Sequence, residues 1–233
     1  MAYLALIVGG YFLVQATGLR MKLRVPALLH NLMLSLVSGY LLVMYLENVW
    51  PMVREQGLMW AICAENAWTA RLEFLYYANY LVKYWELLDT ILLVLRGKRP
   101  IFLHVYHHPA TLLLCFYELK GGAAVCWVPI VLNLSVHVLM YYYYALKEMG
   151  GDVWWKRHLT TMQIVQFILD LAACGAAIYV LILGRNPDWP SLGMTTCRGT
   201  PSSAVIGFGI LSSYLLLFIQ FFIQTYRRPA GAK

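Results

Sequence analysis

The chain has 233 residues, of which 61% are hydrophobic and only 12% are charged. This composition excludes an ordinary soluble domain and is typical of a membrane protein. The net charge of +7 does not indicate a nucleic-acid partner, because the basic residues gather between long apolar stretches. Helices satisfy their own backbone hydrogen bonds in lipid. We therefore expect an all-α polytopic membrane protein.

Seven apolar stretches are long enough to cross a bilayer, at about 20 residues per helix. They cover residues 1–18, 27–46, 71–95, 101–118, 124–145, 159–183 and 203–225. No long linker or low-complexity run separates them, so we predict a single domain over residues 1–233. The first stretch carries no basic residue before Arg20, so it lacks the positive region of a signal peptide. We expect it to be an N-out signal anchor.

The basic residues are distributed unequally between the two sides of these spans. Twelve of the 18 lysines and arginines fall on one side and five on the other, with Lys83 inside a span. The richer side of a multi-pass protein is normally cytosolic. We therefore predict a lumenal N-terminus and a cytosolic C-terminus.

The five cysteines suggest one disulfide. Cys63 and Cys197 fall in the two longest loops on the predicted lumenal side, which is oxidising if the membrane is that of the endoplasmic reticulum. We predict that they pair and join the two halves of the bundle, with Cys126 as an alternative partner. Cys115 and Cys174 lie within spans and are expected to be packing residues.

Polar side chains recur at helical spacing inside several apolar stretches. A helix places residues three and four apart on one face, and ionisable groups in lipid usually face the protein interior and serve a function. We therefore expect these groups to converge on an internal cavity near the cytosolic side, with apolar walls toward the lumen. They are Lys83, Glu86 and Asp89, then His104, His107 and His108, then Asn133, His137 and Tyr141, and finally Gln163, Gln166 and Asp170.

Two further features lie near these groups. Pro109 removes a backbone hydrogen bond directly after the histidines and is expected to kink that helix. His30 and Asn31 are expected to be a polar pair close to the membrane interface, although Asn31 could instead line a cavity.

Four ordered blocks of this chain resemble the signature blocks of a known family. The blocks are KYWELLDT, FLHVYHH, NLSVHVLMYYYY and TTMQIVQF. They resemble those of the ELO family, the very-long-chain fatty acid elongases, which are 3-oxoacyl-CoA synthases of the endoplasmic reticulum. The resemblance implies seven transmembrane helices, six of them around a closed-ended tunnel for the acyl chain. It also implies condensation of an acyl-CoA with malonyl-CoA, with release of carbon dioxide.

The resemblance points to His107 as a nucleophile. A neutral imidazole can attack a thioester and hold the acyl group in activated form. We assign His137 as its partner across the cavity, and His104 and His108 as orienting or proton-transfer groups. Asn133, Gln163 and Gln166 are candidate hydrogen-bond donors to the oxyanion or enolate.

Other residues are candidates for binding the substrates. Lys83 is a candidate contact of the thioester or a phosphate, although it could simply pair with Glu86 or Asp89. Asp170 could join the same network. A basic rim could hold the phosphates of CoA, or could be ordinary positive-inside charge: it consists of Arg96, Lys98, Arg99, Lys156 and Arg157. The full substrate-binding set is Lys83, Glu86, Asp89, Lys98, Arg99, Asn133, Tyr141, Gln163 and Gln166.

Several alternatives remain open. The histidines could be purely structural, or could bind a metal as in the di-iron membrane desaturases, although those need more histidines than the six present; a site with three histidines is also conceivable. Cys115 could be a nucleophile, but it lies about 12 Å along the helix from His107 at ~1.5 Å per residue. A seven-helix receptor or transporter is the non-enzymatic alternative.

The resemblance also bears on cofactors and partners. We expect no metal and no cofactor, only the substrates acyl-CoA and malonyl-CoA. The further partners expected are membrane lipid, the reductase and dehydratase of the elongation cycle, and a second copy of the chain.

Overall fold

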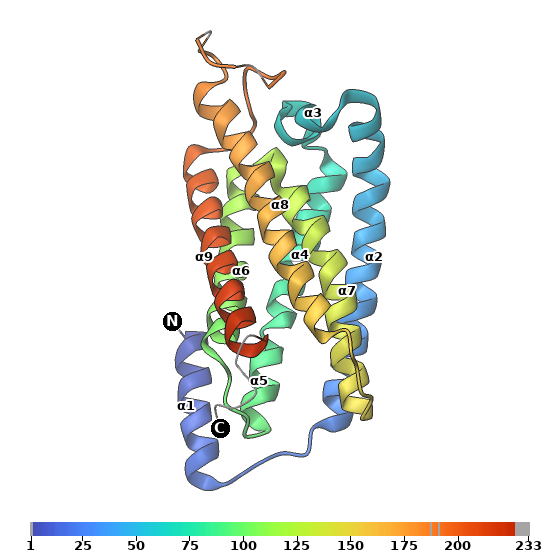
Figure 1. Ribbon diagram of the computed structural model, residues 1–233, viewed down its shortest axis with the longest axis vertical. Helices are drawn as coiled ribbons and strands as arrows, with labels where there is room; N and C mark the ends of the chain where they lie inside the picture. Colours follow the sequence, from blue (N-terminus) through green and yellow to red (C-terminus); the bar gives the residue numbers. More distant parts are fainter. Residues whose placement is uncertain (1, 187, 191, 227–233) are drawn as a thin grey trace.

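A computed structural model describes residues 2–186, 188–190 and 192–226, and this part of the chain is helical without any β-strand (Figure 1). The elements are α1 (Ala2–Thr17), α2 (Arg24–Gln56), α3 (Leu58–Cys63), η1 (Glu65–Ala67), α4 (Ala70–Glu86), α5 (Leu88–Leu95), α6 (Phe102–Gly121), η2 (Ala124–Cys126), α7 (Trp127–Met149), α8 (Lys156–Leu183) and α9 (Pro201–Tyr226). The predicted all-α class is confirmed.

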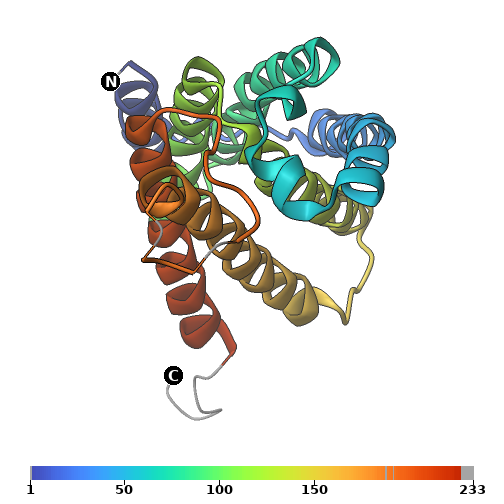
Figure 2. The ribbon, with the colours of Figure 1, turned by 90° about the horizontal axis from the view of Figure 1, so that it is seen from above.

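Six helices form a closed ring of neighbours. Going around it, α2 packs on α4, α4 on α6, α6 on α9, α9 on α8, α8 on α7, and α7 back on α2. Helix α1 stands outside this ring and packs mainly on α5 (Figure 2). The chain order and the spatial order therefore differ, because α6 has α4 and α9 as neighbours rather than α7.

Within the described residues, four helices are long and apolar enough to cross a membrane, namely α2, α8, α9 and the helical stretch Ala124–Met149. The protein is thus a multi-pass membrane protein. The remaining predicted spans, 1–18, 71–95 and 101–118, correspond to α1, α4 with α5, and α6, which are shorter or more polar. Three of the twelve basic residues counted on the predicted cytosolic side, Arg227, Arg228 and Lys233, lie outside the described residues.

Two predicted boundaries were wrong. Helix α2 continues to Gln56, ten residues beyond the predicted end at 46, and contains Pro51. The predicted span 71–95 is interrupted at Leu87, which separates α4 from α5. Helix α6, in contrast, runs without interruption through Pro109. Glu86 and Asp89, two of the predicted site residues, lie on either side of the break at Leu87.

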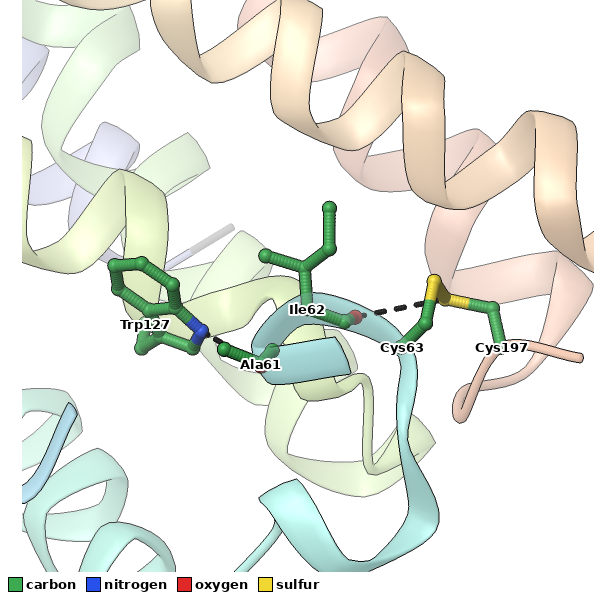
Figure 3. The surroundings of a disulfide bond; sticks show 5 residues. All are labelled: Ala61, Ile62, Cys63, Trp127 and Cys197. Carbon is green, nitrogen blue, oxygen red and sulfur yellow. Dashed lines mark hydrogen bonds between the residues drawn. A yellow bond between two sulfur atoms is a disulfide. The ribbon is translucent and has the colours of Figure 1, made fainter. Parts of the chain in front are cut away.

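Cys63 and Cys197 form a disulfide that joins the end of α3 to the loop between α8 and α9 (Figure 3). The backbone around it is also tied down: Arg198 N donates to Cys63 O at 2.8 Å, and Trp127 Nε1 donates to Ala61 O at 2.9 Å. The predicted pairing is confirmed. Its alternative, Cys126, is a free thiol.

Replacing Cys63 and Cys197 together by serine should lower the free energy of unfolding by about 2–4 kcal/mol, because the bond closes a long loop of 134 residues. Thermal unfolding in detergent measures the change. A reducing agent should lower the unfolding midpoint of the natural protein but not that of the double variant. Equal midpoints for the two proteins without reductant would contradict this prediction.

Candidate active site

Four side chains from α4 and α7, three of them buried and Asn133 partly buried, form a polar network. Lys83 Nζ donates to Glu86 Oε1 at 2.8 Å and to Asn133 Oδ1 at 2.9 Å. Asn133 Nδ2 lies 3.1 Å from His137 Nε2, and His137 Nδ1 lies 3.3 Å from Glu86 Oε1, outside hydrogen-bond geometry. Lys83 and Glu86 are only 2% and 1% exposed. We call these four residues the Lys83 network. Its ammonium and carboxylate compensate each other where an isolated charge would be very costly.

Asp89, one turn after Glu86, belongs to a separate cluster. Its Oδ1 lies 2.5 Å from His30 Nε2, and its Oδ2 accepts a hydrogen bond from Tyr141 at 2.8 Å. His108 Nε2 is 3.7 Å from the same Oδ2. Trp85 Nε1 donates to His30 Nδ1 at 3.1 Å. Asp89 and Glu86 both reach α7, through Tyr141 and His137 respectively, whose ring centroids are 5.3 Å apart, while their remaining partners differ.

His30 was not predicted to be part of the site. It is buried and bound to Asp89. The indole nitrogen of Trp85 can only donate, so the neutral His30 ring accepts at Nδ1 and carries its proton on Nε2, toward Asp89. His30 thus helps to fix the carboxylate that faces His108. Its position one turn into an apolar helix is the only signal for this role in the sequence.

Replacing His30 by alanine should slow turnover by about 10- to 100-fold, which is typical of the loss of a residue that orients a functional side chain. Asp89 would keep Tyr141 but lose its shortest contact. Steady-state kinetics of the purified protein measure the effect. Asn31→Ala is the matched control, since Asn31 is as buried as His30. Equal losses in the two variants would assign His30 a merely structural role.

The three histidines of α6 lie close together. The ring centroids of His104 and His108 are 4.6 Å apart, and those of His107 and His108 are 5.4 Å apart. The ring of His107 packs against Tyr214 of α9 at 4.7 Å. Its backbone oxygen accepts hydrogen bonds from Thr111 Oγ1 at 2.8 Å and Tyr214 OH at 3.2 Å. These contacts hold His107 between α6 and α9.

Two cavities meet at His107. The outer cavity is lined by His104, His107, His108 and His137, among others, and reaches Lys156 at the start of α8. The inner cavity extends to Cys197 and Arg198, beside the disulfide. The two share four wall residues: His107, Asn133, Gln166 and Phe167. His107 therefore belongs to the wall that the two cavities share, with one cavity reaching the start of α8 and the other reaching the disulfide.

Most of the predicted site residues line one or both cavities, and some do not. The lining residues are Lys83, Asp89, His104, His107, His108, Asn133, His137, Gln163 and Gln166. Glu86 and Tyr141 are absent from both walls and instead hold Lys83 and Asp89. Lys98 and Arg99 are exposed and also absent from both walls. Arg96 is engaged with Glu148 at 2.5 Å and 2.9 Å.

The inner cavity is mainly apolar, as predicted, but a few polar side chains also line it. Glu118 and Asp170 both line it, together with Asn79 and three free cysteines. Glu118 Oε2 accepts from Cys126 Sγ at 3.3 Å, and Asp170 Oδ2 accepts from Gln166 Nε2 at 3.3 Å. Glu118 was missed because it stands alone near the end of its apolar stretch. Asp170 does not join the Lys83 network.

No group of three or more His, Cys, Asp or Glu side chains arranged to hold a metal ion is present within residues 2–186, 188–190 and 192–226. The rings of His30, His108 and His137 instead face the carboxylates of Asp89 and Glu86. The alternative of a metal-binding histidine box therefore gains no support from the arrangement of these side chains.

The sequence of the chain matches a known protein family and several curated proteins. The GNS1/SUR4 (ELO) family matches residues 1–233. The chain is 47% identical to "Putative fatty acid elongase 1" of Schizosaccharomyces pombe over 206 residues, which are 88% of this chain and 61% of that protein. It is 38% identical to fatty acid elongase A of Dictyostelium discoideum over 234 residues, 99% of this chain and 82% of that protein.

The similarity extends to animals. Very long chain fatty acid elongase 2 of Mus musculus is 32% identical over 228 residues, covering 91% of this chain and 70% of the mouse protein. The chain spans 61% and 64% of the lengths of the two Schizosaccharomyces pombe relatives that it matches. With the family match covering its whole length, the chain belongs to the ELO family.

Proposed function

We propose that this protein is a 3-oxoacyl-CoA synthase that condenses a long-chain acyl-CoA with malonyl-CoA. The observation that carries the proposal is the position of His107 at the junction of the two cavities. A thioester carbon at this junction would have its acyl chain in the inner cavity and its CoA group in the outer one. The names of the relatives, fatty acid elongases, support the same reaction class.

The first step transfers the acyl group to the enzyme. A ring nitrogen of neutral His107 attacks the thioester carbon, the C–S bond breaks, and CoA leaves as a thiolate that takes up the proton lost by the ring. The product is an acyl-imidazole, which keeps the acyl group activated. The neighbouring histidines of the outer cavity can relay that proton.

The second step forms the new carbon–carbon bond. Malonyl-CoA loses carbon dioxide, and the electron pair of the broken bond becomes the enolate of acetyl-CoA. The enolate carbon attacks the acyl carbon, the C–N bond to His107 breaks, and a proton from solvent returns to the ring. The products are 3-oxoacyl-CoA and carbon dioxide, with CoA already released.

Asn133 and Gln166 are placed to stabilise the developing oxyanion, because both line the two cavities beside His107. Amide donors fixed in a site that excludes water are effective in this role. Lys83 orients Asn133 through the hydrogen bond to its Oδ1. Because Lys83 is buried, it is better placed to contact the thioester than a phosphate of CoA. His137 contacts Asn133 and faces Glu86, and its ring would influence the electrostatic potential near the enolate.

Binding of CoA is proposed for the mouth of the outer cavity, where Lys156 lines the wall. Of the predicted basic rim, Arg96 is neutralised by Glu148. Lys98 and Arg99 would reach the phosphates only from outside the cavity wall. We therefore assign the main phosphate contact to Lys156, with Arg157 adjacent in sequence.

We further propose that seven segments cross the membrane of the endoplasmic reticulum, with the six-helix ring enclosing the acyl chain. The disulfide would then lie on the oxidising lumenal side, and the mouth of the outer cavity on the cytosolic side, where acyl-CoA and malonyl-CoA are available. The C-terminus would be cytosolic. Acyl-CoA, malonyl-CoA, membrane lipid, the other enzymes of the elongation cycle and a second copy of the chain are the proposed partners.

The reaction can be tested with purified protein, a panel of saturated acyl-CoAs and malonyl-CoA labelled at its free carboxyl carbon. We expect labelled carbon dioxide and a 3-oxoacyl-CoA two carbons longer than the substrate. Failure to release label with any chain length would contradict the proposal. Stoichiometric zinc or iron in the purified protein would instead favour the metal-dependent alternative.

A further inference from the structure

The ring of His107 is held differently from three other imidazoles of the site. The rings of His30, His108 and His137 each face a carboxylate, at 2.5–3.7 Å, and a carboxylate at a ring nitrogen fixes the orientation of an imidazole. Among residues 2–186, 188–190 and 192–226, no group forms a hydrogen bond or an ion pair with a ring nitrogen of His107. The orientation of this ring must therefore come from its packing and from its backbone.

Tyr214 of α9 supplies both of these contacts. Its ring packs on the imidazole of His107, with 4.7 Å between the ring centroids and an angle of 43° between the ring planes. Its hydroxyl donates to His107 O at 3.2 Å. Tyr214 is only 1% exposed, and its ring is itself packed against Phe167 at 5.6 Å. A rigidly held side chain thus touches His107 at both ends of the residue.

The backbone at His107 needs such support because a proline follows it. Pro109 has no N–H, so it cannot donate the usual helical hydrogen bond to the carbonyl oxygen of Val105, although α6 runs on through it. Thr111 Oγ1 donates to His107 O at 2.8 Å and lies 2.9 Å from the hydroxyl of Tyr214. Two hydroxyl groups therefore converge on one carbonyl oxygen beside the weakened turn.

We propose that Tyr214 is a positioning residue for the transfer of the acyl group to His107. Its ring and its hydroxyl hold the imidazole in the orientation in which a free ring nitrogen meets the thioester carbon. This inference rests on the proposed function, which makes His107 the nucleophile. An acyl chain in the inner cavity fixes the thioester carbon in one place, so the attacking nitrogen must be fixed as well, and a misplacement of about 1 Å can cost about 100-fold in rate.

The test variant is Tyr214→Phe, which removes the hydroxyl and keeps the ring. Purified protein is mixed with acyl-CoA alone, and the acyl adduct is timed by intact-mass measurement over a range of acyl-CoA concentrations. We expect the rate at saturating acyl-CoA to fall by about 10- to 100-fold, the scale of a displaced reacting group. The half-saturating concentration should stay the same, because the lost contact matters only in the transition state.

Tyr106→Phe is the matched control. The hydroxyl of Tyr106 lies 2.9 Å from Ser213 Oγ, so this variant loses a hydrogen bond between the same two helices, one residue earlier on each. Tyr106 lines neither cavity and makes no hydrogen bond to His107. The control should form the adduct at the natural rate.

Variants of Thr111 address the same carbonyl oxygen without changing Tyr214. Thr111→Val removes the second hydroxyl at nearly constant shape and should also slow formation of the adduct, whereas Thr111→Ser keeps the hydroxyl and should restore the natural rate. Groups that act through one shared partner are not additive. The double variant of Tyr214→Phe with Thr111→Val should therefore lose less than the product of the two single losses.

The outcomes separate this inference from the proposed function. If the natural protein forms the adduct and Tyr214→Phe forms it equally fast, the inference is wrong while the proposed function stands. Equal slowing in Tyr106→Phe would assign both hydroxyls to the general packing of α6 on α9 and would also overturn it, as would a raised half-saturating concentration at an unchanged maximal rate. If the natural protein forms no adduct, the proposed function fails at its first step and the inference fails with it.

Discussion

His107→Ala is expected to lower the rate of condensation by about 10⁴-fold or more, which is the scale of losing a catalytic nucleophile. With acyl-CoA alone, the natural protein should gain the mass of one acyl group, and the variant should gain none. Intact-mass measurement detects the adduct directly. We expect this effect because, of the three histidines of α6, His107 alone lines both cavities.

His158→Ala is the matched control for this experiment, since His158 is exposed beside Trp154 and away from both cavities. It should retain full activity and the full adduct. An adduct that persists in His107→Ala but disappears in Cys115→Ala would make the thiol the nucleophile. An adduct that persists in both variants would exclude both His107 and Cys115 as the nucleophile.

Glu86→Ala should destabilise the protein by about 3–5 kcal/mol, because it leaves the buried ammonium of Lys83 without its counter-charge. Lys83 would keep only the neutral amide of Asn133. The free energy of unfolding, from denaturant titration in detergent micelles, measures the loss.

The double variant Lys83→Met with Glu86→Gln should recover most of that stability, since it removes both charges together. Activity should not return, because Asn133 and His137 would lose the groups that orient them. A double variant as unstable as Glu86→Ala would show that the pair is not what holds this region together. Recovery of activity would show that catalysis does not require the Lys83 network.

Much of the site was predictable because its signals are local. The spacing of His104, His107 and His108 and of Asn133 and His137 places each set on one helical face, and the cost of polar groups in lipid turns those faces inward. The pairing of Cys63 with Cys197 was also predictable, since both fall in loops on the same predicted side. These inferences need only helix periodicity and solvation.

The partners of individual side chains were not predictable in the same way. Nothing in the spacing of Glu86 and Asp89 distinguishes their partners, yet Glu86 binds Lys83 and Asp89 binds His30. His30 lies 59 residues from Asp89. Only the packing of α2 against α4 and α7 brings such distant residues together.

The sequence by itself determined the class of protein, the inward-facing polar groups and the disulfide, because hydrophobic length and helical periodicity act within one segment. The tertiary structure decided the order of helices in the ring, the junction of the cavities at His107, and the packing of Tyr214 on His107. Helix periodicity specifies which face of a helix is buried, whereas the neighbour that this face meets depends on the packing of all the helices together.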